Sequence, residues 1–290
     1  MTTVIFLSSC NYENSSTSNY GDCILIDTGS ELIIYDCGSE KHAEAVQSYM
    51  DSHGYKAAKL ILSHNDSDHS KGIKKLYDDG YISEIRTTLL LKYKEELLKR
   101  IDDGRKTDHS IAEQILSTYD NIANLSGAPL KDIYENPFRV CDGVEIIGPS
   151  KEDMLDAVAK LLDTREGNNM DSETIVNATS IQVKVSFGAH SLLLCGDSSL
   201  AAVENVVRSY DAVQLPHHGK AKQAEGIFQL KFDQPSSIYI VSDNTGATNG
   251  GSDKLDTTGH RVLNTKNGNV TINDLSFSTS SYKTGRTLGV

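Results

Sequence analysis

The sequence Leu60-Ile61-Leu62-Ser63-His64-Asn65-Asp66-Ser67-Asp68-His69-Ser70-Lys71-Gly72 decides how this chain is interpreted. An apolar run leads into two histidines and two aspartates within six positions, and a helical pattern begins at Ile73. This order predicts a buried strand, a turn that carries polar side chains, and a helix. Imidazole nitrogens and carboxylate oxygens are ligands that zinc, manganese and iron share. The alternative is a solvated turn in which aspartate and serine cap the helix.

Two later segments place the same kinds of side chain directly after predicted strands. Asp197 follows a strand predicted over 191–195, and His217 and His218 follow one predicted over 211–215. Each signal alone is weak, because Asp197 could cap the next helix and a histidine pair in a loop is more often a surface turn. Functional sites are commonly built in loops at strand ends. Three such clusters in one chain therefore predict a shared metal centre.

Composition limits the classes of function. The 290-residue chain carries a net charge of −12, so no global basic field would attract a nucleic-acid backbone or an anionic membrane. No apolar run is long enough to span a membrane, and the N-terminal apolar run lacks the basic start of a signal peptide. The five cysteines are odd in number and widely spaced, which predicts reduced thiols in a cytoplasmic protein.

The periodicity of apolar residues predicts two β-rich halves within a single domain over 1–290. The first half predicts strands over 3–9, 22–28, 31–37 and 58–63, a helix over 40–53, and an inserted helical segment over 89–126 that is interrupted at 102–104. The second half predicts strands over 143–148, 180–187, 191–195, 211–215 and 237–242, helices over 151–163 and up to Tyr210, and a polar loop over 164–174. This pattern favours an α/β (α+β) fold arranged as a four-layer αββα sandwich.

The clusters resemble the signature of the metallo-β-lactamase superfamily. Its H-x-H-x-D-H motif, later Gly-Asp and final His before Gly correspond to 64–69, 196–197 and 217–219. The segments at Gly21-Asp22 and Asp36-Cys37-Gly38 also match the family, so the resemblance covers nearly the whole chain. It implies a sandwich of the metallo-β-lactamase type and a metal-dependent hydrolase. Asp36 would hold the ligand loop.

Within the superfamily the chain looks most like the soluble domain attached to competence DNA-uptake channels (ComEC-type), here as a stand-alone relative. That group also has Asp in place of the second motif histidine, which is Asp66 here. Its Asn-rich segment, Asn177 to Ser180 in this chain, replaces a histidine ligand of other members. The segment 243–246 departs from the group's Tyr-Gly-His-Pro. We expect Asn177, Thr179 and Asn244 near the ligands or the substrate.

Carried over residue by residue, the resemblance implies two sets of metal ligands. One set is Asp68, His69, Asp197 and either His217 or His218, of which His218 directly precedes Gly219. The other set is His64, Asp66 and Asp197. Because the second set lacks one imidazole, we expect it to bind its metal more weakly and to accept manganese as well as zinc. Asp68, His69 and Asp197 would be the catalytic residues.

Such a centre implies hydrolysis by a metal-activated hydroxide with one or two Zn²⁺ or Mn²⁺ ions. The subgroup resemblance predicts a phosphodiesterase or nuclease, with a small phosphodiester or single-stranded nucleic acid as substrate. A hydrolase of a small phosphorylated, ester or thioester metabolite is the alternative, because the same nucleophile also opens esters. A catalytically weak binding module that retains the fold is the third reading. The residues do not specify an oligomeric state.

Overall fold

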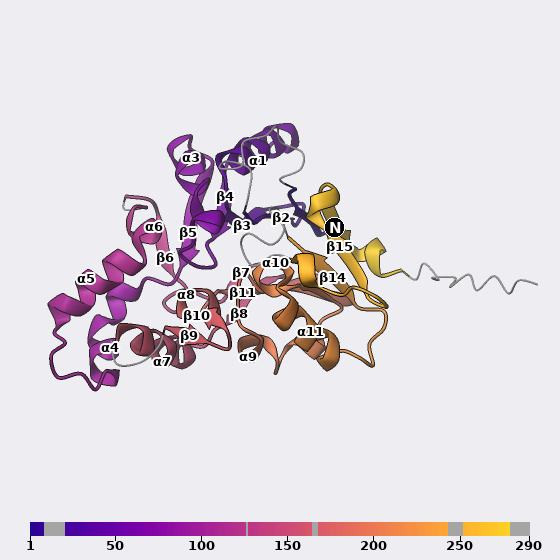
Figure 1. The fold of residues 1–290 in the computed structure, drawn as a ribbon. Coiled ribbons are helices and arrows are strands. Elements are labelled where there is room, and N and C mark those ends of the chain that lie inside the picture. The colour runs from indigo at the N-terminus through magenta and orange to yellow at the C-terminus, as the bar shows by residue number, and fades with distance from the viewer. Residues whose placement is uncertain (9–20, 126, 164–167, 243–251, 279–290) are drawn as a thin grey trace, which may run out of the picture.

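The computed structural model describes residues 1–8, 21–125, 127–163, 168–242 and 252–278 (Figure 1). Two seven-stranded sheets pack face to face, and helices cover their outer faces. In Figure 1, α1 and α3 lie on one side of the paired sheets, and α9 and α11 lie on the other. The predicted four-layer αββα sandwich is confirmed.

The first sheet has the strand order β16-β1-β2-β3-β4-β5-β6. Its strands are β1 (Thr3–Phe6), β2 (Cys23–Asp27), β3 (Leu32–Cys37), β4 (Ala58–Ile61), β5 (Ile82–Thr87), β6 (Leu130–Asp132) and β16 (Val270–Asn273). Its helices are α1 (Glu40–His53), α2 (Ser67–Ser70) and α3 (Ile73–Asp78). β2 and β3 form the predicted antiparallel hairpin, whereas β3, β4 and β5 run parallel because helices connect them.

The second sheet has the strand order β15-β14-β13-β12-β11-β8-β7. Its strands are β7 (Arg139–Cys141), β8 (Val144–Gly148), β11 (Gln182–Phe187), β12 (His190–Leu194), β13 (Ala212–Gln214), β14 (Ile238–Val241) and β15 (Arg261–Asn264). The helices of this half are α7 (Lys151–Leu162), α8 (Ile175–Ala178), α9 (Leu200–Val203), α10 (Pro216–Gly219) and α11 (Ala221–Leu230). β12, β13 and β14 are parallel, so their carboxyl ends meet at one edge.

Alternation along the strands separates the layers of the core. Leu192 and Leu194 of β12 face the first sheet, whereas Leu193 between them packs on the outer side with Ile227 of α11. Tyr35 of β3 ties the two sheets together, because its buried hydroxyl donates a hydrogen bond to the carbonyl of Ile181 at 2.7 Å. Each fully buried aliphatic side chain contributes roughly 1.5–3 kcal/mol to this packing.

The predicted helical insertion is present. It contains η2 (Leu90–Tyr93), α4 (Lys94–Arg100), α5 (Asp108–Thr118) and α6 (Asp120–Ala123). Arg100 at the end of α4 forms ion pairs with Glu152 and Asp156 of α7, which fasten the insertion to the second half of the chain.

The predicted polar loop over 164–174 is wrong from Asn169 onward, and its residues 164–167 lie outside the described part of the chain. β9 (Asn169–Met170) and β10 (Glu173–Thr174) form a short hairpin there, with Asp171 and Ser172 at positive φ in its turn. The helix predicted to end at Tyr210 is only α9 and η3 (Val207–Ser209). The polar run carries no alternation of apolar residues, so its strands could not be recognised from periodicity.

Two further findings concern targeting and redox state. Among the described residues, no helix is both long and apolar enough to cross a membrane. The four cysteines in the same part of the chain, Cys23, Cys37, Cys141 and Cys195, are free thiols.

Candidate metal centre

The three predicted clusters meet at one edge of the paired sheets. His64 follows β4, Asp197 follows β12 and His217 follows β13. β12 and β13 are parallel, so the side chains that follow them emerge at the same edge of the second sheet. The ligand turn after β4 faces them from the first sheet.

Asp197 lies at the centre of the cluster and is 2% exposed. Its Oδ1 is 3.3 Å from Nε2 of His69, and its Oδ2 is 3.7 Å from Nε2 of His217 and 3.9 Å from Nε2 of His64. The two oxygens of one carboxylate therefore face different imidazoles. This one carboxylate thus lies between imidazoles on two sides of the cluster.

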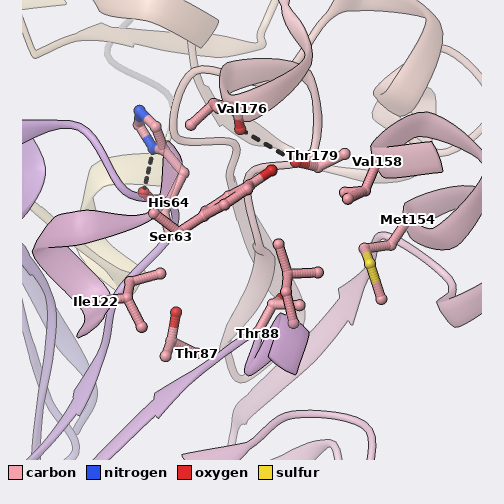
Figure 2. A pocket seen from close by; sticks show the side chains of 11 residues that line it. Ser63, His64, Thr87, Thr88, Ile122, Met154, Val158, Val176 and Thr179 are labelled. Atoms are coloured by element: carbon pink, nitrogen blue, oxygen red, sulfur yellow. Dashed lines mark hydrogen bonds between the residues drawn. The ribbon is translucent and has the colours of Figure 1, made fainter. Parts of the chain in front are cut away.

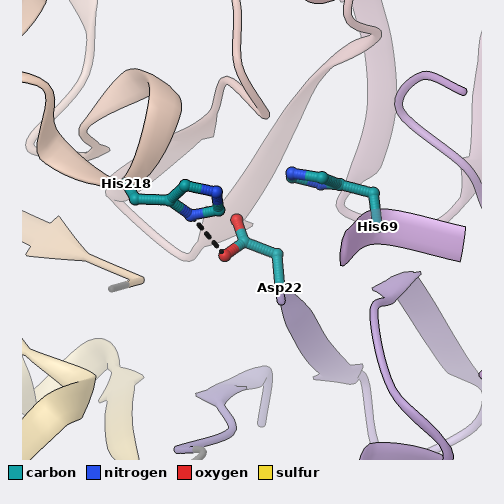
Figure 3. Close-up of side chains that lie close together, drawn as sticks. All are labelled: Asp22, His69 and His218. Atoms are coloured by element: carbon teal, nitrogen blue, oxygen red, sulfur yellow. Dashed lines mark ion pairs between the residues drawn. The ribbon is translucent and has the colours of Figure 1, made fainter. Parts of the chain in front are cut away.

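Neighbouring oxygens orient the imidazoles of His69 and His218. Nδ1 of His69 lies 2.8 Å from Oδ2 of Asp36, and Nδ1 of His218 donates to the carbonyl of Ser242 at 3.1 Å, with Oδ1 of Asp22 3.2 Å away. Figure 3 shows the rings of His69 and His218 pointing toward one another from separate elements, with Asp22 between them. A carboxylate or carbonyl oxygen on Nδ1 fixes the tautomer and leaves Nε2 available to a metal.

The rings of His64 and His217 are held in the same way. Nδ1 of His64 lies 2.9 Å from the hydroxyl of Ser63, and Nδ1 of His217 lies 2.6 Å from Oε2 of Glu173. All four imidazoles thus have Nδ1 engaged and Nε2 close to a carboxylate of the cluster, Asp197 or Asp68.

Several buried polar atoms of the cluster have no hydrogen-bond partner within the described residues. They are Oδ1 of Asp22, Nε2 of His64, Nε2 of His69 and Oδ1 of Asp197. Leaving such a group unsatisfied costs roughly 1–3 kcal/mol, so a chain that holds these four together is built for a ligand. Two ligand groups, Asp22-His69-His218 and His64-His69-Asp197, each converge within 4.8 Å. The donor set of imidazoles and carboxylates fits zinc or manganese.

The two other acidic residues of the turn differ in burial. The side chain of Asp68 is 13% exposed, and its Oδ2 lies 3.2 Å from Nε2 of His218. The side chain of Asp66 is 42% exposed, and its Oδ2 lies 3.7 Å from Nε2 of His64. Asp66 therefore marks the side on which the cluster reaches solvent.

Asp36 contacts the ligand turn at Ser63 in addition to the ring of His69. Its Oδ1 accepts a hydrogen bond from the backbone N–H of Ser63, and its Oδ2 accepts one from the hydroxyl of Ser63, both at 2.7 Å. Asp36 adopts a positive φ of 59°, a strained conformation for an aspartate. The several hydrogen bonds that converge on this carboxylate stabilise that conformation.

Asn177 joins the cluster, but Thr179 does not. Nδ2 of Asn177 donates to Oδ2 of Asp197 at 3.2 Å. The hydroxyl of Thr179 donates to the carbonyl of Ile175 at 2.8 Å. Thr179 lines a cavity of about 20 Å³ that also touches His64, Met154 and Val158 (Figure 2). Asn244 lies outside the described residues.

Three residues of the site were not predicted as such. Asp22 lies beside His218, Glu173 orients His217, and Asn65 binds the insertion. The side chain of Asn65 donates to the carbonyl of Thr118 at 3.1 Å and accepts from the N–H of Ile122 at 3.0 Å. The insertion therefore stabilises the ligand turn through its hydrogen bonds to Asn65. The position of Asp22 in the family's Gly-Asp strand could have signalled its role, whereas Glu173 lies in a polar run without a motif.

Replacing Gly38 by alanine should disrupt the ligand turn. A Cβ at this position would lie 1.9 Å from the backbone oxygen of Asp68, and a backbone atom cannot move aside as a flexible side chain does. We expect a loss of about 3 kcal/mol in the free energy of unfolding. Urea unfolding measures it, with Gly104→Ala as control, because a Cβ there would meet nothing within 4 Å. Equal stability of the two variants would contradict the tight approach.

The charged groups of the cluster shift each other's ionisation. Burial opposes the charged form of Asp197, but the imidazoles of His69 and His218 outweigh burial and hold the pKa of Asp197 well below its usual range. Burial likewise opposes protonation of His69, but Asp197 and Asp36 hold the pKa of the ring well above 6.5. Asp197 and Asp22 raise the pKa of His218 in the same way. The carboxylates of the cluster thus favour the protonated, positively charged form of the His69 and His218 imidazoles.

We expect the metal-free protein to lose stability as the pH rises above 6.5. An imidazole whose pKa is raised by folding stabilises the folded state fully below its unfolded pKa of 6.5, and this contribution is lost as the pH rises through the folded pKa values of His69 and His218. Metal binding has the opposite dependence, because Nε2 must release its proton. Melting temperatures in chelator and in Zn²⁺ or Mn²⁺ should therefore diverge with rising pH. A metal effect that is independent of pH would contradict this.

Comparison with known families agrees with the fold. An αββα sandwich with imidazoles and carboxylates gathered at one edge of its sheets is a metal-binding hydrolase scaffold. A model of the metallo-β-lactamase superfamily matches residues 17–242, and the chain belongs to this superfamily. The predicted superfamily is confirmed, whereas no comparison addresses the ComEC-type subgroup. A search of curated protein sequences found no significant match.

Two solved structures are similar along most of their length. The metallo-β-lactamase fold protein YhfI from Bacillus subtilis superposes with a TM-score of 0.56 at 13% identity, covering 94% of this chain and 100% of that chain. Tm1679, described as a metal-dependent hydrolase of the β-lactamase superfamily, gives a TM-score of 0.51 at 12% identity, covering 94% and 98%. At these identities the similarity shows a shared fold.

Proposed function

We propose that this chain is a metal-dependent phosphodiesterase that acts on a small phosphodiester or on single-stranded nucleic acid. The observation that supports the proposal is the position of Asp197, which directs one carboxylate oxygen to His69 and the other to His64 and His217. A pair of adjacent cation sites suits displacement at phosphorus, because charge develops on both the entering and the leaving oxygen.

When bound, Zn²⁺ or Mn²⁺ ions would supply Lewis acidity and lower the pKa of water. The chain's own residues would hold and orient the reacting groups. Asp36 keeps Nδ1 of His69 engaged and the carbonyl of Ser242 keeps Nδ1 of His218 engaged, so Nε2 of each ring faces the centre. Oδ2 of Asp68, whose side chain is 13% exposed, would accept a hydrogen bond from the attacking water and so direct its lone pair at the substrate.

Oxygen-rich ligation supports the same proposal. Asp66 replaces one histidine of the superfamily motif, and Asn177 lies where another histidine is found. The competence-channel group has the same two replacements, and we propose that the chain is related to it. Carboxylate ligands make manganese an acceptable occupant beside zinc. Manganese and magnesium are the usual partners of phosphate oxygens in proteins.

An apolar groove favours a second candidate function, the hydrolysis of an ester or thioester with an apolar chain. The groove has a volume of about 360 Å³ and lies on the insertion between η2 and α5, where Leu91 and Leu116 are exposed. It adjoins the cavity at His64, and four residues line both: Thr88, Leu90, Tyr119 and Ile122. An acyl chain could lie there.

A substrate panel tests the two candidates. The purified chain, stripped with chelator and reloaded with Zn²⁺ or Mn²⁺, is given bis-p-nitrophenyl phosphate, single-stranded DNA, RNA, cyclic nucleotides and p-nitrophenyl esters of increasing acyl length. We expect metal-dependent cleavage of phosphodiesters. Cleavage of esters alone, with a rate that grows with chain length, would support the second candidate, and a chain that binds metal yet cleaves nothing would indicate a binding module.

A further inference from the structure

His217 approaches the same oxygen of Asp197 as His64 does. Nε2 of His217 lies 3.7 Å from Oδ2 of Asp197, whereas His69 approaches Oδ1. His218 instead approaches Asp68, and its ring stacks on that of His69 with centroids 5.5 Å apart. The two adjacent histidines therefore belong to different halves of the cluster.

The backbone conformation explains how the adjacent residues His217 and His218 direct their rings to different halves of the cluster. His217 and His218 both adopt left-handed conformations, with φ of 50° and 56°, and Gly219 follows at φ 77°. Their ring centroids are 5.8 Å apart and the ring planes differ by 69°. The backbone N–H of His217 donates to the carbonyl of Gly196 at 3.1 Å, which joins this turn to the Asp197 loop. Two left-handed residues in succession are unfavourable, so the conformation indicates a constraint on where the rings point.

Glu173 holds the ring of His217 in place. Its Oε2 lies 2.6 Å from Nδ1 of His217, and its Oε1 accepts hydrogen bonds from Gln223 at 2.8 Å and lies 2.9 Å from Nζ of Lys220. Glu173 is 1% exposed, so the β9–β10 hairpin delivers a buried carboxylate to this ring. The pair repeats the arrangement of Asp36 with His69.

The amide of Asn177 leaves one ligand position on this side without an imidazole. Its Nδ2 donates to Oδ2 of Asp197 at 3.2 Å, the same oxygen that His64 and His217 approach. An amide nitrogen that donates a hydrogen bond has no lone pair for a metal. His217 provides a further Nε2 on this side, 3.7 Å from the same oxygen.

We propose that His217 is the metal ligand that takes the place of the histidine missing at Asn177, with Glu173 as its positioning residue, and that His217 and His218 serve different ions. The inference rests on the proposed two-metal centre. It revises the expectation of one tight and one weak site, because the site of His64 and Asp66 regains an imidazole. Two ions of similar affinity are then expected.

Metal analysis of variants tests the inference without reference to turnover. Bound metal is counted after dialysis to equilibrium against Zn²⁺ or Mn²⁺. The proteins compared are wild type, His217→Ala, His218→Ala and Glu173→Gln. His109→Ala is the control, because the side chain of His109 is 83% exposed on the insertion. We expect two equivalents in wild type and control, one in His217→Ala, and 10- to 100-fold weaker binding of one equivalent in Glu173→Gln. The Co²⁺ spectrum of His217→Ala should lose one of two imidazole-ligated signals.

The outcomes separate this inference from the proposed function. Two equivalents with wild-type affinity in His217→Ala would overturn the inference and leave the hydrolase proposal standing. Wild-type protein that binds no metal would overturn both. Circular dichroism of each variant in chelator checks folding, and His217→Asn, which preserves a polar side chain in the turn, replaces His217→Ala if the alanine variant does not fold.

Discussion

Replacing Asp197 by asparagine should lower metal-stimulated hydrolysis by about 10³, the largest effect expected of any single substitution here. The two oxygens of Asp197 face His69 on one side and His64 and His217 on the other. Asparagine offers one oxygen and one N–H₂ group, so at most one side keeps an acceptor, and the negative charge that both cation sites share is lost.

The same variant should lose bound metal while it keeps its fold. Asparagine has nearly the volume of aspartate, so packing around this buried position is preserved. Hydrolysis rate and bound metal are measured on one sample, with Asp142→Asn as control, because the side chain of Asp142 is 94% exposed and far from the cluster in the sequence. A variant that keeps both metal equivalents would show that Asp197 is no shared ligand.

The layers of the fold could be predicted because each half repeats apolar strands that end in turns. β2, β3, β4, β11 and β12 follow from alternation or from continuous apolar runs. β5 was not recognised, because Glu84 and Arg86 are buried within it as an ion pair, only 7% exposed each. Because charged residues are usually exposed, this buried ion pair makes the sequence of an interior strand resemble that of a surface segment.

The side chains that gather in the cluster could be predicted, but the groups that orient them could not. His64, Asp68 and His69 lie within one short motif, so spacing alone indicates a site. Glu173 acts on His217, which is 44 positions further along the chain, and only the tertiary fold brings them together. The choice between His217 and His218 depends on two left-handed backbone conformations that no residue type requires.

Replacing Asp68 by asparagine should impair chemistry far more than folding. Asp68 lies between His218 and the exposed side of the cluster. Its Oδ2 is 3.2 Å from Nε2 of His218. Burial opposes its ionisation, but the hydrogen bond to His218 and the charge of His69 outweigh burial and hold the pKa of Asp68 well below its usual range, so it is charged at neutral pH. Asparagine keeps the volume and removes the charge that balances a cation and orients water.

We expect the Asp68→Asn variant to keep a near-native melting temperature and to lose about 10² or more in turnover. The fold contact at this residue survives, because its backbone oxygen still accepts the N–H of Asp22 at 2.9 Å. If Asp68 served only as a favourable charge in the first turn of α2, the order would reverse, with about 1 kcal/mol of stability lost and activity retained. Melting temperature and phosphodiesterase rate of one sample distinguish the two, with Asp78→Asn, an exposed partner of Lys74, as control. A lowered melting temperature with unchanged turnover would remove Asp68 from the reaction.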